Sequence, residues 1–112
     1  MVSQLRRGDL ITVAIPGDYG KPRPALVIQS DLFLRDPTSI TVLLLTSDLH
    51  RGLPVRIDVP PSPENGLHKP SQIMVDKVQT IASEKAGKAI GRLDDDTMVT
   101  VTRLLAVFLG FA

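Results

Sequence analysis

The stretch ITVLLLT, residues 40–46, decides the fold class of this chain. Its apolar side chains occupy successive positions instead of alternate ones, which is typical of a strand that is buried on both faces of a sheet. We therefore expect Ile40–Thr46 to be a central strand, with the remaining elements arranged around it.

Shorter apolar runs on both sides of this stretch predict further strands. PVRIDV, residues 54–59, alternates apolar and charged residues, as a half-exposed strand does. Pro24 lacks an N–H donor, so its strand should begin there or lie at an edge. Ser30 is expected to cap a single helical turn that runs through Leu34. The other expected strands are Asp9–Ile15, Arg23–Gln29, Ser71–Val75, Val78–Ala82 and Ala89–Leu93, with Asp76 and Lys77 separating Ser71–Val75 from Val78–Ala82.

The C-terminal segment has the pattern of a helix. Asp94 is a suitable N-cap, two further aspartates suit the positive end of the helix dipole, and Gly110 is a suitable stop. Helical spacing relates Met98, Val101, Leu104, Leu105 and Phe108. Short strands followed by one amphipathic helix predict a mainly β chain with α (α+β), built as a small barrel or strongly bent sheet with the helix packed against it.

Composition limits the classes of function. A chain of 112 residues, 43% of them apolar, is expected to form one domain over residues 1–112. The absence of cysteine excludes thiolate catalysis and disulfides and fits a reducing cytoplasm. No apolar run approaches the roughly 18 residues of a membrane helix, and no signal peptide is evident, so we expect a soluble cytoplasmic protein with no membrane association. Three phenylalanines and one tyrosine are too few for an aromatic RNA-stacking platform.

Known catalytic and cofactor motifs are missing. The chain has no phosphate-binding GxxxxGK[ST] loop, no GxGxxG and no GxSxG nucleophile elbow. His50 and His68 are its only histidines, and neither belongs to a metal-ligand pattern. The aspartates at 94–96 are best explained as a helix start. We therefore expect no metal and no cofactor.

Five segments in order carry a family resemblance. They are RRGDL (6–10), KPRPALVIQ (21–29), LLLTSD (43–48), QIMVDKVQTI (72–81) and the terminal LDDD…LLAVFLG. Together they resemble the MazF/PemK family of toxin endoribonucleases, from Arg7 to Gly110. The resemblance implies an SH3-like twisted β-barrel of the CcdB/PemK type, a homodimer, and neutralisation by a cognate antitoxin. It also implies cleavage of single-stranded mRNA without a metal, which inhibits translation. In that reaction the 2′-OH attacks the adjacent phosphorus and leaves a 2′,3′-cyclic phosphate and a 5′-OH.

Three residues match the catalytic positions of this family. Arg23 matches its arginine, and a guanidinium can hold two phosphate oxygens at once. Thr46 matches its threonine, whose hydroxyl can donate a hydrogen bond to a phosphate oxygen. Asp18 stands near the place of the family's glutamate, in a loop about three residues shorter than usual. It is expected to orient Arg23 or to accept a proton, and the alternative is that Asp18 only forms the turn.

Further residues are expected to bind RNA. Lys21 adds positive potential beside Arg23, and Ser47 offers a second hydroxyl or an amide beside Thr46. His50 and Arg51 follow in the same loop and can contact phosphate or base. Lys77 replaces a glutamine that is frequent in the family, so it is expected to contact phosphate instead of reading sequence.

Two other readings stay open at this point. A gyrase-inhibiting toxin like CcdB resembles the same fold, but it depends on a C-terminal Trp-Gly-Ile-type end, whereas this chain ends in LGFA and has no tryptophan. A catalytically silent binding module is the second alternative, which the presence of Arg23 and Thr46 disfavours. The homodimer is expected to use the third-strand region and the C-terminal helix.

Overall fold

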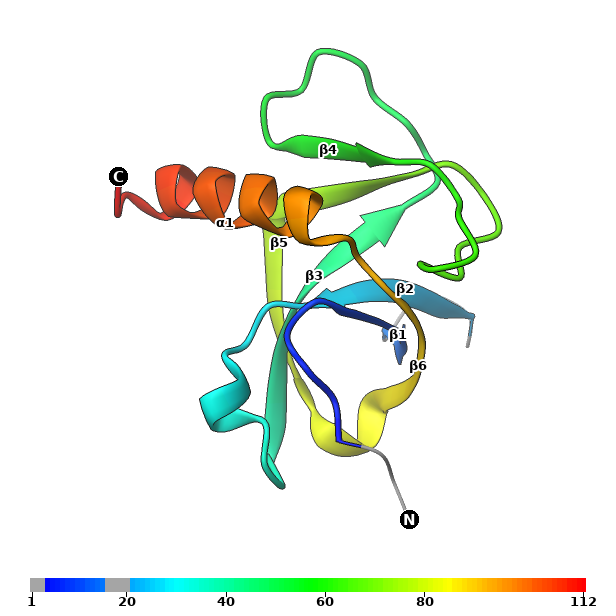
Figure 1. The fold of residues 1–112 in the computed structure, drawn as a ribbon, viewed down its shortest axis with the longest axis vertical. Helices are drawn as coiled ribbons and strands as arrows, with labels where there is room; N and C mark the ends of the chain where they lie inside the picture. The colour runs from blue at the N-terminus through cyan, green and yellow to red at the C-terminus, as the bar shows by residue number, and fades with distance from the viewer. Residues whose placement is uncertain (1–3, 16–20) are drawn as a thin grey trace.

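The computed structural model describes residues 4–15 and 21–112. Six strands form one antiparallel sheet, and a single α-helix follows them (Figure 1). The strands are β1 (Asp9–Ala14), β2 (Pro22–Val27), β3 (Ser39–Thr46), β4 (Arg56–Val59), β5 (Ser71–Ala82) and β6 (Ala86–Arg92). Short 3-10 helices η1 (Asp31–Phe33) and η2 (Ser83–Lys85) precede β3 and β6, and α1 spans Asp95–Leu109.

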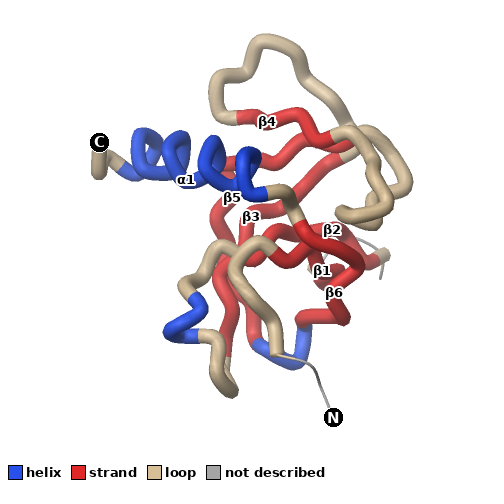
Figure 2. The backbone as a smooth tube through the Cα atoms, viewed as in Figure 1, coloured by secondary structure: helices blue, strands red, loops and turns tan. Residues whose placement is uncertain are grey.

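The predicted architecture, mainly β with one packed C-terminal helix, is confirmed. The strand order is β4-β5-β3-β2-β1-β6, so β3 pairs on both sides, as expected for the apolar stretch at 40–46. The expected turn after Ser30 is η1, in which the Ser30 hydroxyl accepts a hydrogen bond from Leu32 N. Figure 2 shows that the strands wrap around one another instead of lying flat.

The prediction of two strands on either side of Asp76 and Lys77 was wrong, because β5 is continuous. Its register with β3 changes sharply at this point: Leu45 pairs with Ile73, whereas Leu43 pairs with Val78. Between these pairs β5 bulges away from β3 and follows β4, with Val75 N donating to Val55 O at 2.9 Å. The polar pair that resembles a turn in the sequence therefore lies in a bulge.

Both faces of the sheet are buried, and the period of the strands decides which side chain faces which core. Neighbours such as Leu10 and Ile11 belong to different apolar clusters. The first cluster packs against Met98 and Val101 of α1 and also holds Leu26, Leu43, Leu45, Ile73 and Val75. The second cluster lies on the other face and holds Val13, Ala25, Val27, Ile40, Val42 and Ile81.

Helix α1 begins and ends at the predicted caps. The Asp94 carboxylate accepts from Thr97 N at 3.0 Å, and Gly110 adopts the left-handed conformation with φ 84°. Hydrogen bonds from Thr97 lower the pKa of Asp94 below its ordinary value of 3.8. The buried side chains of the helix, Met98 and Val101, lie in its first half, and Leu104 and Leu105 are partly buried against the same core. Phe108, which shares the helical spacing, is 45% exposed, because α1 extends past the sheet that covers Met98.

The loop between β4 and β5 closes the bent sheet into a barrel-like shape. Arg92 N, on edge strand β6, donates to Glu64 O of this loop at 2.8 Å. A Cβ added at Gly91 would lie 2.4 Å from Asn65 O, so only glycine permits this approach. The two edge strands of the sheet are thus connected through the loop.

Candidate active site

Four polar residues line up across four neighbouring strands when the β2–β3 register is continued past its last pair. Thr46 of β3 pairs with Gln72 of β5, and Gln72 pairs with Asp58 of β4. The β2–β3 register pairs Ala25 with Leu44, and continuing it by two residues brings Arg23 opposite Thr46. We call Arg23, Thr46, Gln72 and Asp58 the polar row; with strands about 4.8 Å apart it spans roughly 14 Å.

The polar row lies on the face of the sheet away from α1. Along β3, β5 and β4 its members alternate with Leu45, Ile73 and Ile57, which pack in or against the cluster beneath the helix. Because successive side chains of a strand point to opposite faces, Thr46, Gln72 and Asp58 share the other face. The row is therefore clear of the helix.

The Thr46 side chain is positioned by the chain that follows it. Its Oγ1 accepts a hydrogen bond from Asp48 N at 3.0 Å, a local turn that serine and threonine favour. Thr46 Oγ1 thus acts as an acceptor, while its own O–H donates to no acceptor among residues 4–15 and 21–112. Thr46 ends β3 and is partly exposed, so this donor faces the surface.

Arg23 and Lys21 lie where the chain enters β2. Both are exposed, and Arg23 pairs through its backbone with Val13 of β1. The register thus brings together the two residues that the sequence analysis matched to catalytic positions. Asp18 lies outside the described residues, and its role stays a prediction.

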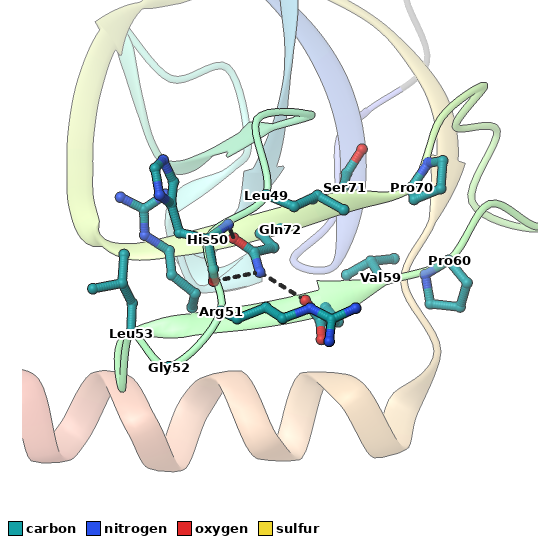
Figure 3. Close-up of a pocket in the computed structure, with 12 residues that line it drawn as sticks. Leu49, His50, Arg51, Gly52, Leu53, Val59, Pro60, Pro70, Ser71 and Gln72 are labelled. Carbon is teal, nitrogen blue, oxygen red and sulfur yellow. Dashed lines mark hydrogen bonds between the residues drawn. The ribbon is translucent and has the colours of Figure 1, made fainter.

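Gln72 is a residue that the sequence analysis did not assign to the site. Its side-chain amide makes three hydrogen bonds: His50 N donates to Oε1 at 3.0 Å, and Nε2 donates to His50 O at 3.0 Å and to Asp58 Oδ1 at 2.8 Å (Figure 3). Gln72 is 5% exposed. A buried amide with matched partners restrains the loop that follows Thr46. The only signal in the sequence is a glutamine next to the apolar run at 73–75.

The loop after β3 carries the other predicted contacts. His50 Nε2 lies 3.5 Å from Asp48 Oδ2, and both side chains are well exposed. His50 and Arg51 line a cavity of about 640 Å³ that also reaches Arg56, Asp58 and Gln72. Ser47 is exposed at the start of the loop but does not line this cavity. Lys77 is exposed in the bulge of β5 and also lies outside it. The structure thus groups His50 and Arg51 near the polar row.

The described residues form neither a metal site nor a helix that could span a membrane. Over residues 4–15 and 21–112, no three histidine or acidic side chains gather as a metal site would require. Within the same ranges no helix is long and apolar enough to cross a membrane.

Comparison with known proteins adds to this geometry. The family described as PemK-like, MazF-like toxin of type II toxin-antitoxin system matches residues 6–109. The "Probable endoribonuclease MazF" of Mycolicibacterium smegmatis is 43% identical over 109 residues, which cover 96% of this chain and 99% of the relative. Endoribonuclease EndoA of Bacillus subtilis is 26% identical over 111 residues, 95% of each chain.

The fold is similar to that of a solved structure, an endoribonuclease in complex with its cognate antitoxin from Mycobacterial species. The TM-score is 0.80 at 21% identity, and the match covers 96% of this chain and 97% of the other. The family matches nearly the whole chain, and the fold agrees with it over the same length. The chain therefore belongs to the family of PemK-like, MazF-like toxins of type II toxin-antitoxin systems.

Proposed function

We propose that this protein is a toxin endoribonuclease that cleaves single-stranded mRNA without a metal and so inhibits translation. The observation that carries the proposal is the register that brings Arg23 opposite Thr46 at one end of the polar row. A relative that is 43% identical and carries the name endoribonuclease supports the same activity.

The reaction needs alignment and charge stabilisation more than covalent help from the protein. The 2′-oxygen attacks phosphorus, the bond from phosphorus to the 5′-oxygen breaks, and a 2′,3′-cyclic phosphate and a 5′-OH result. Arg23 holds the non-bridging oxygens, whose charge grows in the transition state, and its permanent charge suits that role. The Thr46 hydroxyl donates to one of the same oxygens.

Two protons must move in this step. The attacking 2′-OH loses one, and the leaving 5′-oxygen gains one. We assign Asp18 as acceptor of the first proton or as the residue that orients Arg23, and Arg23 as the donor of the second proton to the leaving 5′-oxygen, a proton that it recovers from solvent water. Lys21, Ser47, His50, Arg51 and Lys77 are proposed to bind the RNA on either side.

We also propose a homodimer and a cognate antitoxin as partners. The second half of α1 leaves Val107, Phe108 and Leu109 about half exposed, and such apolar surface supports its use as an interface. Because β3 is paired on both edges, the third-strand region can contribute through its face alone. The antitoxin is expected to be acidic, partly disordered and able to cover the polar row.

The test is cleavage of a long single-stranded RNA in excess EDTA. We expect the wild type to cut it and to leave 5′-OH ends, which a kinase can label without prior dephosphorylation. Arg23→Ala should abolish cutting, and Arg35→Ala, a change to another exposed arginine, should not. Intact RNA with the wild type, or equal cutting by Arg23→Ala, would refute the proposal. Gyrase inhibition without RNA cleavage would support a CcdB-like role instead.

A further inference from the structure

The cavity at the far end of the polar row has a composition that none of the assigned roles explains. It lies between the loop at 49–53 and the edge formed by β4 and β5 (Figure 3). Part of its lining is apolar, from Leu49, Leu53, Val59, Pro60 and Pro70. Most of the rest is polar, with two arginines and a histidine beside Asp58, Ser71 and Gln72. A cavity of about 640 Å³ is large enough to hold a planar nucleobase between such walls.

The charges of the lining suit a nucleotide. Arg51 and Arg56 supply two permanent positive charges, which favour a phosphate. Arg56 is only 13% exposed in its side chain; its Nε lies 3.8 Å from Asp76 Oδ1, and neither of these two atoms has a hydrogen-bond partner among the described residues. Asp58 is the one acidic residue among the lining residues that the structure describes.

A carboxylate in a site for an anionic polymer is unfavourable unless it has a donor to bind. Gln72 Nε2 engages Asp58 Oδ1 at 2.8 Å, and this bond orients the carboxylate. Within residues 4–15 and 21–112 no second donor reaches Asp58, which leaves Oδ2 to accept from a ligand. Carboxylates read the amino groups of bases by this kind of bond.

We propose that this cavity binds one unpaired nucleobase of the RNA, next to the cleaved bond, and that Asp58 selects a base with an exocyclic amino group. The inference rests on the proposed ribonuclease function. Asp58 stands two strands from Thr46, roughly 10 Å away, within reach of a nucleotide beside the phosphate that Arg23 and Thr46 hold. Uracil has no amino group and presents an acceptor where cytosine has a donor, so it faces Oδ2 with repulsion.

The test begins with the wild type alone. We expect cut sites mapped on a long RNA to show one flanking position that is depleted in uracil. In short synthetic substrates, replacing the amino group of the base at that position by hydrogen should lower kcat/KM about tenfold or more, as loss of a hydrogen bond to a charged group does. Equal rates on the parent and the analogue at every flanking position would overturn the inference.

Asp58→Asn provides the matched variant. Asparagine keeps an oxygen that can accept from Gln72 Nε2. In place of Oδ2, which accepts hydrogen bonds, it has an amide nitrogen, which donates them. We expect this variant to lose the penalty for removing the amino group and to accept uracil at that position. Asp95→Asn makes the same change of charge on α1, outside the cavity, and should keep the wild-type preference. An Asp58→Asn protein with the wild-type preference would overturn the assignment of Asp58.

These outcomes separate the inference from the function on which it rests. A wild type that cuts no RNA overturns the proposed function, and the inference with it. A wild type that cuts RNA but treats all bases alike overturns the inference only. Because the analogue experiment needs no variant, it decides the question even where Asp58→Asn fails to fold.

Discussion

Replacing Gln72 by methionine tests whether the buried amide holds the loop after Thr46. Methionine has nearly the same length and fits a buried site, so the change mainly removes hydrogen bonds. Three bonds are lost, two to the His50 backbone and one to Asp58. At about 0.5–1.5 kcal/mol for each bond to the backbone and about 1.5–3 kcal/mol for the bond to the carboxylate, their sum is about 2.5–6 kcal/mol.

The lower part of that range applies here. His50 and Asp58 are both exposed residues, so water can replace part of what Gln72 provides. We therefore expect Gln72→Met to lower the free energy of unfolding by about 2.5 kcal/mol. Urea denaturation measures this loss; with a slope of about 1–2 kcal/mol per molar, the midpoint should fall by about 1–2.5 M.

The control is Gln79→Met, on the same strand. Gln79 is partly exposed, and its pairing with Val42 is through the backbone, so we expect a change below about 0.5 kcal/mol. RNA cleavage should fall in Gln72→Met more than RNA binding does, because a looser loop misplaces Thr46 while the basic side chains remain. A loss of stability no larger than that of Gln79→Met would refute the reasoning.

Three further predictions follow from individual contacts. Thr46→Val should lower the cleavage rate about 100-fold, because it removes the donor to the phosphate, whereas Thr46→Ser should restore most of it; equal rates for the two would contradict this role. The lowered pKa of Asp94 means that its cap stabilises the protein at pH values above 3.8, the ordinary pKa, and that this stabilisation is lost as the pH falls through the lowered pKa. Urea titrations from about pH 7 to 2 should therefore show a larger loss of unfolding free energy for the wild type than for Asp94→Asn. Gly91→Ala should lower Tm by about 8 °C or more, since its Cβ would overlap Asn65. An unchanged Tm would contradict this, because it would mean that the loop moves aside without loss of stability.

The parts of the fold that were predicted correctly depend on local chemistry. The caps of α1 are side chains and conformations that act within a few residues, as the bond from Thr97 N to Asp94 shows. The central position of β3 follows from an apolar run with no polar face. The ends of β6 were less accurate, since β6 begins at Ala86 instead of Ala89, where its partner β1 is already within reach.

The error at β5 has a non-local cause. Asp76 and Lys77 are polar and adjacent, and such a pair between two apolar runs predicts a turn. In the structure this segment leaves β3 for β4, and Asp76 lies 3.8 Å from Arg56 across that contact. A partner strand, which no local pattern specifies, keeps the segment extended.

Residues close together, or ordered segments along the chain, were enough to predict the family, the apolar central strand, the capped C-terminal helix, and Arg23 and Thr46 as candidates. The continuation of the row by Gln72 and Asp58 beyond Thr46 could be seen only in three dimensions, since it depends on the register of β3 with β5 and of β5 with β4. Register is set by pairing between distant segments and by the core on each face, and a shift of one residue in one strand would turn that strand's member of the row to the opposite face.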